Sequence, residues 1–274
     1  MSIVPTSELR TYIGDVTESE CDCYDAIHSS VEAFVKNYCN RTFESTPYTK
    51  QKYSGKGFAT LQLDDFPLTA VDRVSIGIID VIRIKNTNSN STASVSVTST
   101  GLRLVKDGTA DTSVTFASNT TLTAIVSAIN GVSGWSAELL TSNYGSFKSS
   151  ELLEWYGLNA INNNWVYLRI PDDAEDEFEV DLERGWIIKR SGWPKGWNNI
   201  VVDYTAGYSA SNMPEDLKEA IKHFIKVIYN KKVEESFGLK EYRIGVNSIL
   251  SVFDGKDMPQ EIKSVLSYYR RVKV

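Results

Sequence analysis

The sequence predicts an α+β protein with a mainly helical core, a small β-sheet and an inserted domain that is β-rich or α+β. Two segments, 17–40 and 214–232, carry apolar residues at the spacing of a helix that buries one face. Two others, 71–76 and 201–204, combine β-branched and aromatic residues with polar ones, as half-buried strands do. Between residues 80 and 181, Ser, Thr and Asn become frequent and charged residues become sparse over much of the stretch. This change of composition indicates a separate folding unit.

These observations divide the chain of 274 residues. We expect a discontinuous core made of residues 1–79 and 182–238, an inserted β-rich domain at 80–181, and a C-terminal arm with a short helix at 239–274. Such an insertion costs little, because lengthening a loop from about ten to about a hundred residues adds only about 2 kcal/mol of closure entropy. The core can therefore keep its fold around the insert.

The first elements of the core are two helices. A short helix begins near Thr6 and ends at Gly14. Thr17 and Glu20 then form a capping box, in which the hydroxyl and the carboxylate each bind a free backbone N–H at the start of the second helix. The apolar stripe of this second helix consists of Tyr24, Ile27, Val31, Phe34, Val35 and Tyr38.

The longest helix of the core begins at Pro214, because proline is favoured at the first helical position, where its missing N–H has no partner. Glu215 and Asp216 follow and interact favourably with the positive end of the helix dipole. The apolar stripe carries Leu217, Ile221, Phe224, Ile225 and Ile228. A last short helix begins after Pro259 and ends in basic residues.

The insert is expected to contain mainly strands, separated by turns with Gly or Asp-Gly. Strand-like runs occur at 81–84, 93–97, 102–105, 113–116, 135–140, 152–155 and 165–170. One short helix, capped by Asn119 or Thr120, lies between them and ends at Gly131.

Three groups of residues in the expected core form short motifs. The first is Val202, Tyr204, Thr205, Ala206, Gly207 and Tyr208, followed by Met213, Pro214, Asp216, Leu217, Lys218 and Ala220. The second is Leu9, Arg10, Tyr12, Ile13, Gly14 and Asp15 with the later stretch 32–43. It continues with Leu63, Pro67, Leu68, Val71 and Val74. The third is Gly185 and Ile187, then Pro194, Gly196, Asn198, Val201, Val202 and Tyr204. Together they resemble the head-tail connector family of tailed bacteriophages, also called adaptor or head-completion proteins.

The resemblance implies a structural subunit of a phage neck, located in the virion at the head-tail interface after synthesis in the host cytoplasm. Subunits of this family form a ring of twelve copies between the portal protein and a stopper or tail-completion protein, and DNA passes through without sequence-specific binding. The insert carries no such resemblance. An alternative from another class is a carbohydrate- or host-binding module of a phage tail or baseplate, in which Trp135, Trp155 and Trp165 are the stacking candidates.

Two sets of residues are candidates for contacts between proteins. An apolar arm needs a covering surface, and family C-terminal segments reach neighbouring parts of the neck, so we expect portal or neck contacts at Tyr242, Ile244, Ile249, Leu250, Phe253, Arg270 and Arg271. On the longest helix, Lys218, Lys222 and Lys226 share one face and are candidates to line a channel or a subunit contact. The alternative for these lysines is an exposed face on which Glu215 and Glu219 pair with them.

The sequence offers no catalytic residue set, and we expect no enzyme activity, cofactor or metal. Its two histidines, His28 and His223, lie on different helices without a ligand spacing or a nucleophile motif, and each is expected at a helix surface or boundary. The acidic stretch 171–184 lacks the pattern of a calcium loop and is interpreted as a solvated linker. Cys21, Cys23 and Cys39 are interpreted as reduced, because their spacing fits neither a zinc site nor a disulfide pair.

The charge of the chain excludes one further class of partner. A formal net charge of −6 disfavours a protein that grips nucleic acid, because phosphate binding needs clustered Lys and Arg. It does suit a passage through which DNA slides. With no apolar run long enough for a membrane span, we expect a soluble protein without a membrane partner.

Overall fold

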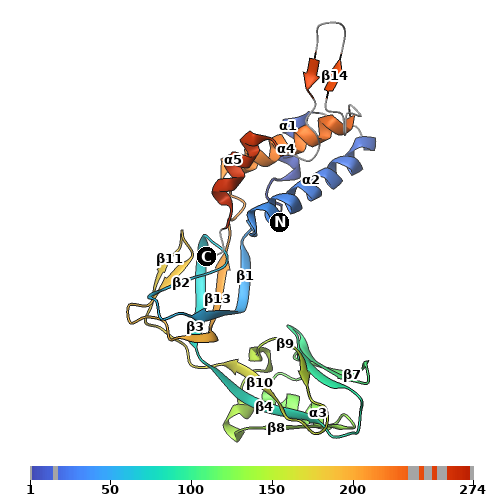
Figure 1. Cartoon of the computed structure of the whole chain (residues 1–274), viewed down its shortest axis with the longest axis vertical. Coiled ribbons are helices and arrows are strands. Elements are labelled where there is room, and N and C mark those ends of the chain that lie inside the picture. Colours follow the sequence, from blue (N-terminus) through green and yellow to red (C-terminus); the bar gives the residue numbers. More distant parts are fainter. Residues whose placement is uncertain (1, 15–17, 234–240, 244–248, 252–257, 272–274) are drawn as a thin grey trace.

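The computed structural model describes residues 2–14, 18–233, 241–243, 249–251 and 258–271. These residues form three tiers stacked along the long axis of the molecule (Figure 1). We call them the helical tier, which contains α1, α2, α4 and α5, the sheet tier, which contains β1, β3 and β13, and the insert tier, which runs from β4 to β10. Each tier has its own cluster of buried apolar side chains, and the three clusters share no described residue.

The helical tier is built from both ends of the chain. Its helices are α1 (Thr6–Ile13), α2 (Glu18–Cys39), α4 (Glu215–Val233) and α5 (Gln260–Tyr269). The stripes expected from the sequence meet here: Val31 and Val35 of α2 and Leu217 and Ile221 of α4 are buried in the same cluster. Leu266 of α5 closes this core, so helices far apart in the sequence depend on one another for burial.

The sheet tier contains two antiparallel sheets of three strands. The first has the order β1 (Thr46–Gly55), β13 (Gly196–Ala206) and β3 (Leu68–Ile76). The second has the order β11 (Glu179–Asp181), β12 (Trp186–Ile188) and β2 (Thr60–Gln62). Strand β13 is central because it pairs on both sides, Val202 opposite Gln51 of β1 and Val74 of β3. Its β-branched residues are therefore buried, whereas β1 and β3 are partly exposed.

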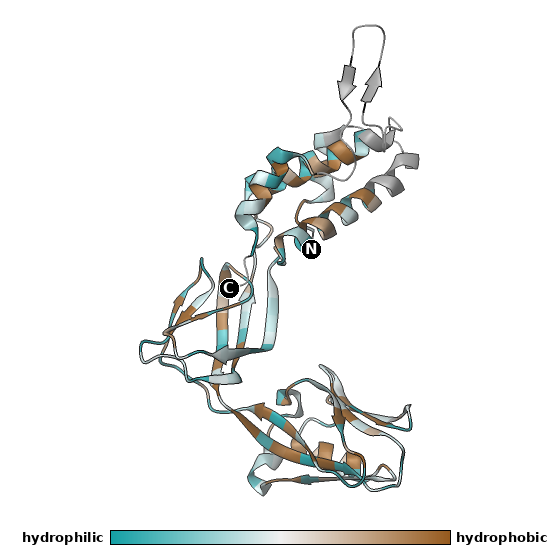
Figure 2. Cartoon of the chain, in the orientation of Figure 1, coloured by the Kyte–Doolittle hydropathy of each residue, from teal (hydrophilic) through white to brown (hydrophobic). Residues whose placement is uncertain are grey.

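The insert tier holds two further sheets and a helix, and Figure 2 shows its hydrophobic residues concentrated on β4, β10 and α3. One sheet has the order β10 (Val166–Pro171), β4 (Ile78–Asn86) and β8 (Trp135–Leu139). The other has the order β7 (Thr109–Thr115), β6 (Gly101–Lys106), β5 (Ala93–Val97) and β9 (Trp155–Asn159). Helix α3 (Leu122–Asn130) and the short 3₁₀ helices η1 (Ser142–Ser146) and η2 (Ser149–Glu151) complete it. Separately, β14 (Glu241–Arg243) pairs with β15 (Ile249–Ser251).

The expectation of a mainly helical core is wrong, because strands predominate among the described elements. The helices lie at one end of the sheet tier and keep a core of their own. The physical reason is the weak signal of edge strands: β1 consists largely of polar, half-exposed residues and is a strand only because it pairs with β13. Long helices can be recognised in a sequence by the periodic spacing of their apolar residues, and edge strands such as β1 cannot.

Local boundaries also differ from the expectation in the insert. The helix cap is Thr121, whose hydroxyl accepts from the Ala124 N–H at 3.3 Å, and not Asn119 or Thr120. The strand expected at 152–155 begins only at Trp155, because η2 ends at Glu151 and residues 152–154 belong to no helix or strand. The capping threonine expected for α2, Thr17, lies outside the described residues.

Candidate interaction surfaces

The motifs that carry the family resemblance come together at the waist, the junction between the helical tier and the sheet tier. The Ser45 N–H donates to the Tyr208 carbonyl at 2.9 Å, and the Tyr208 N–H donates to the Phe43 carbonyl at 2.7 Å. The Gly207 N–H donates to the Pro67 carbonyl at 2.8 Å. Phe43 and Pro67 come from the second motif group and Gly207 from the first, so residues far apart in the sequence act in one junction.

A buried arginine closes the waist. Arg41 is 6% exposed, and its guanidinium lies 4.2 Å from the ring centre of Phe66, 5.0 Å from that of Phe43 and 5.9 Å from that of Tyr208. It also donates to the Phe66 carbonyl. Burial lowers the pKa of Arg41, while the nearby Tyr208 and Asp65 oppose that change. Aromatic rings and a carbonyl thus replace water around this cation.

The lysine row of α4 is turned toward α1. Lys218 Nζ lies 2.6 Å from Glu215 and Lys222 Nζ lies 2.9 Å from Glu219, which are the two pairs expected on a salt-bridged face. Glu8 of α1 adds a contact of 3.3 Å to Lys222. Both lysine side chains are only 10% exposed, so the face is covered by α1 and is not open to solvent.

Charge pairing also changes the titration of this row. The hydrogen bond to Glu219 is the main reason why the pKa of Lys222 is raised, although burial opposes it. Lys226 lies next along the row, with its ammonium 5.2 Å from the ring centre of Tyr12 in α1. That Lys218, Lys222 and Lys226 line a channel or subunit contact stays a prediction.

The described structure covers only part of the expected contact set in the C-terminal arm. Ile244 and Phe253 lie outside the described residues. Tyr242, Ile249 and Leu250 belong to the paired strands β14 and β15 and are described by that pairing alone. Their role in portal or neck contacts therefore stays a prediction.

The two arginines of that set lie beside the waist. The Arg270 guanidinium is 5.6 Å from the ring centre of Tyr38. The Arg271 N–H donates to the Cys39 carbonyl at 2.9 Å, and its guanidinium pairs with Asp64 of the sheet tier. Arg271 thereby links the end of α5 to both α2 and the sheet tier within one chain.

An anchor for the N-terminal segment was not foreseen from the sequence. One oxygen of Glu32, Oε1, accepts from the backbone N–H groups of Ile3 at 2.8 Å and Val4 at 3.1 Å, and from Ser2 Oγ at 2.5 Å. His28 Nε2 lies 3.1 Å from the same oxygen. The surface or boundary position expected for His28 is wrong, because this histidine is buried.

This Ser-His-Glu cluster does not have the geometry of a catalytic relay. In a relay, the acid and the nucleophile bind opposite nitrogens of the imidazole. Here Ser2 Oγ and Glu32 Oε1 both lie 3.1 Å from the same nitrogen, Nε2 of His28. Burial raises the pKa of Glu32, but the hydrogen bonds from His28, Ser2 and Val4 outweigh burial and hold the pKa below its usual value. The cluster therefore acts as a structural carboxylate anchor.

A polar seam joins the sheet tier to the insert tier. Lys50 Nζ donates to the carbonyls of Ser150 and Leu152, both at 2.8 Å. Lys52 Nζ donates to the Glu154 carbonyl at 2.7 Å. Burial lowers the pKa of both lysines, and the nearby Glu154 opposes this change. Two cations of the sheet tier thus bind three backbone oxygens of the segment 150–154 in the insert tier.

Arg73 of β3 completes this seam. It lies 2.7 Å from Glu151 of the insert tier and 2.9 Å from Asp203 of its own sheet. Burial lowers the pKa of Arg73, but the two carboxylates outweigh it and the pKa is raised. The chain enters the insert through Gly77 alone between β3 and β4, so these polar contacts set the orientation of the insert tier.

An aromatic cleft, which we call the tryptophan cleft, lies beside the seam between the same two tiers. The rings of Trp155 and Trp197 meet edge to face, with centres 6.3 Å apart. The Lys52 ammonium lies 5.1 Å from the ring centre of Trp155. The cleft encloses about 260 Å³. Its apolar lining consists of Ile78, Val97, Leu153, Leu158, Val166 and Leu168.

The three tryptophans named as sugar-stacking candidates do not form one platform. Trp135 is 4% exposed and belongs to the core of the insert tier. Arg83 and Lys85 each lie 4.5 Å from the ring centre of Trp165. Only Trp155 lines a cleft, and its neighbour there, Trp197, comes from β13 of the sheet tier.

Within the described part of the chain, no group of three or more His, Cys, Asp or Glu side chains is placed to hold a metal ion. Cys39 is a buried free thiol, and burial raises its pKa to about 11, although Arg41 and Arg270 oppose the shift. No helix within the described ranges combines the length and the hydropathy that a membrane span requires.

Comparisons with known proteins give distant structural likenesses only. No protein-family model matches the sequence, and no curated protein matches it. A chain from the neck of an empty gene transfer agent particle computed with C6 symmetry is 13% identical, with a TM-score of 0.36, 99% of this chain covered and 91% of that chain. A chain from the neck of the native particle computed with C12 symmetry is 11% identical, with the same coverage and a TM-score of 0.36. A chain from the virion of the native particle is 12% identical, with the same coverage and a TM-score of 0.34. Likenesses of this size carry no argument about function.

Proposed function

We propose that this protein is a structural subunit of a phage-type neck, forming a ring between a portal protein and a stopper or tail-completion protein. The observation that carries the proposal is the waist, where Phe43 and Pro67 of the second motif group meet Gly207 of the first in one hydrogen-bonded junction. The proposal rests on these motifs and their geometry, and the distant structural likenesses are not part of it.

The geometry suits a subunit that transmits mechanical force. The waist joins the helical and sheet tiers through buried Arg41 and the Arg271–Asp64 pair, so forces along the chain pass through fixed contacts. A homo-oligomeric ring of twelve copies, closed by side-to-side contacts between unlike surfaces, fits this role. The net charge of −6 per chain suits a passage for DNA without sequence-specific binding. No catalytic step, cofactor or membrane is part of the proposal.

A carbohydrate- or host-binding module is not favoured by the geometry. Such a module needs exposed rings that share one face, and the three candidate tryptophans occupy three different environments. We therefore advance one function only.

Co-expression with the portal protein of the same genome tests the proposal. We expect negative-stain images of the purified complex to contain rings with a central hole, with this protein attached to one face of the portal. A Gly207→Ala variant, which breaks the waist, is expected to lose the ring, while Gly108→Ala, at an open turn of the insert tier, is expected to keep it. Images of separate particles that do not bind the portal protein, together with binding of this protein to glycans, would contradict the proposal.

A further inference from the structure

The turn between β11 and β12 carries an exposed leucine between two carboxylates. Leu182 is 48% exposed and is flanked by Asp181 and Glu183. The Leu182 carbonyl accepts the Leu68 N–H at 2.7 Å, and Asp181 Oδ1 accepts the Arg184 N–H at 3.1 Å. These bonds hold the turn in place, so little conformational freedom is lost if Leu182 binds another surface.

The turn belongs to the acidic stretch 171–184, which carries more carboxylates than its ion pairs use. Glu175, Glu179 and Asp181 are each paired with a cation of the sheet tier, at distances between 2.5 and 3.5 Å. Four further carboxylates are exposed and form no ion pair with another described residue: Asp172, Asp173, Asp176 and Glu183. A partner for this stretch must therefore offer cations.

The tryptophan cleft offers the complementary chemistry. Its lining includes the cations Lys52 and Arg169 but no carboxylate, although Arg169 also pairs with Asp80 at 2.8 Å. Trp197 stands at the cleft and is 74% exposed, which is unusual for an indole on a protein surface, and the neighbouring Tyr156 is also exposed. The occupant that fits has an apolar side chain flanked by carboxylates, as Leu182 is.

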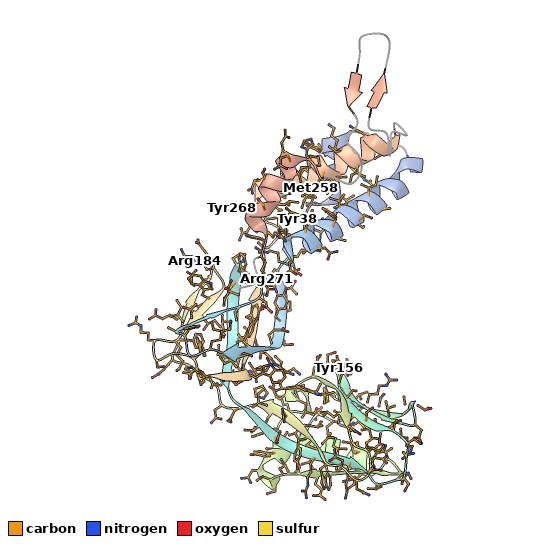
Figure 3. All side chains as sticks on the ribbon, viewed as in Figure 1. Tyr38, Tyr156, Arg184, Met258, Tyr268 and Arg271 are labelled. Carbon is orange, nitrogen blue, oxygen red and sulfur yellow. The ribbon has the colours of Figure 1, made fainter. Side chains whose placement is uncertain are left out.

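The two surfaces lie on different sides of one molecule. Figure 3 places Arg184, next to the acidic turn, at one side of the sheet tier and Tyr156, next to the cleft, toward the opposite side where the insert tier begins. Two complementary patches on different sides of a chain produce head-to-tail contacts, which close into a ring when the rotation permits.

We propose that the Leu182 turn of one copy docks into the tryptophan cleft of a second copy. Leu182 enters the cleft beside the paired rings of Trp155 and Trp197, and the free carboxylates of the acidic stretch face Lys52 and Arg169. This contact rests on the proposed ring, because it names the surfaces through which neighbouring subunits meet.

Mixing two variants tests this contact in the full chain. Leu182→Asp removes the docking side chain but leaves the tryptophan cleft intact. Trp197→Ala removes one wall of the cleft but leaves the Leu182 turn intact. In analytical ultracentrifugation over a concentration series, we expect each variant alone to associate at least about tenfold more weakly than wild type, equivalent to about 1.4 kcal/mol. The equimolar mixture is expected to form a one-to-one dimer that grows no further, because each chain supplies one intact surface.

Leu140→Asp is the matched control, because Leu140 is a similarly exposed leucine, at 40%, that belongs neither to the acidic stretch nor to the lining of the cleft. It is expected to associate like wild type. Unchanged association of both test variants, a mixture that fails to recover dimers, or a wild-type chain that stays monomeric with and without portal protein overturns the contact. If both variants still form rings on the portal protein, the proposed contact is wrong and the proposed function is unaffected. A wild-type chain that forms head-to-tail chains but no ring on the portal would remove the function and leave the contact.

Discussion

At the scale of single residues, Gly207 decides whether the waist can form. Its φ of +105° lies in a region that side chains rarely adopt. A Cβ added there would lie 2.4 Å from the Glu44 carbonyl oxygen, a backbone atom that cannot move aside. The glycine is therefore required by both backbone conformation and close approach.

Replacing Gly207 by alanine is expected to lower the free energy of unfolding of the helical and sheet tiers by about 2–4 kcal/mol, through backbone strain and the clash. Urea unfolding followed by circular dichroism measures the loss. Gly108→Ala is the matched control, because Gly108 also has a positive φ, +77°, but nothing lies within 4 Å of the added Cβ. We expect the control to lose only about 1 kcal/mol, and equal losses would refute the role of the close approach.

Glu32 is the second residue with a consequence that can be measured. Its folded-state pKa lies below the usual value because His28, Ser2 and Val4 bind the carboxylate. A lowered pKa means that the stabilisation is present above the pKa of the unfolded chain and is lost as pH falls through the folded pKa.

Glu32→Gln is expected to reduce the free energy of unfolding by about 2 kcal/mol at neutral pH, the scale of hydrogen bonds to a charged group. The difference from wild type should shrink as pH falls below the ordinary glutamate pKa of about 4.3, because the wild-type carboxyl is then also neutral. Thermal unfolding between neutral and acidic pH checks this, and a difference that stays constant with pH would contradict the anchor.

At the scale of elements, the lysine row of α4 is explained by α1. Helix α1 has only eight residues, too few to be stable alone, and it is held by Leu9 in the core and by Glu8 against Lys218 and Lys222. The face that the sequence offers as a channel lining is thus used inside the chain. That the row lines a channel or a subunit contact stays a prediction.

Glu8→Gln is therefore expected to loosen α1 while leaving α4 helical. The Glu8 side chain is partly exposed, so we expect a loss of only about 0.5–1 kcal/mol, seen as faster hydrogen exchange of the α1 amides. Glu215→Gln is the control, since Glu215 pairs with Lys218 within α4, whereas Glu8 reaches the lysines from α1. Equal exchange of α1 in both variants would show that Glu8 does not hold the helix.

At the scale of the whole molecule, the insert tier has its own apolar core and is attached by two chain crossings and a polar seam. Apolar burial holds the inside of each tier, whereas ion pairs and lysine–carbonyl bonds set the angle between them. Ion pairs weaken in salt, and apolar cores do not.

The angle of the insert tier is therefore expected to depend on salt and on Arg73. In small-angle X-ray scattering, Arg73→Gln should increase the radius of gyration and widen the distance distribution, and 1 M salt should do the same to wild type. Arg83→Gln is the control, because Arg83 pairs with Glu138 inside the insert tier, at 2.6 Å. A scattering profile that neither the Arg73 change nor salt alters would refute the seam.

Much of the helical tier could be predicted from the sequence. The stripes around Val31 and Leu217 and the start of α4 after Pro214 are local signals, because a helix satisfies its hydrogen bonds within one segment. The pairs of Lys218 with Glu215 and Lys222 with Glu219 were foreseen for the same reason. The balance of helix and sheet was not, since β1 depends on a partner, β13, that lies about 150 residues away.

The sequence by itself determined where the helices lie, that the stretch between residues 80 and 181 differs in composition, and which motifs resemble a connector. Only the tertiary structure decided that these motifs meet at the waist around Arg41, that α1 covers the lysines, and that Trp155 and Trp197 of different tiers share one cleft. Spacing along a chain records contacts within a few residues. Contacts between distant segments form only when strands pair and apolar surfaces pack together. No local pattern in the sequence specifies which segments become partners.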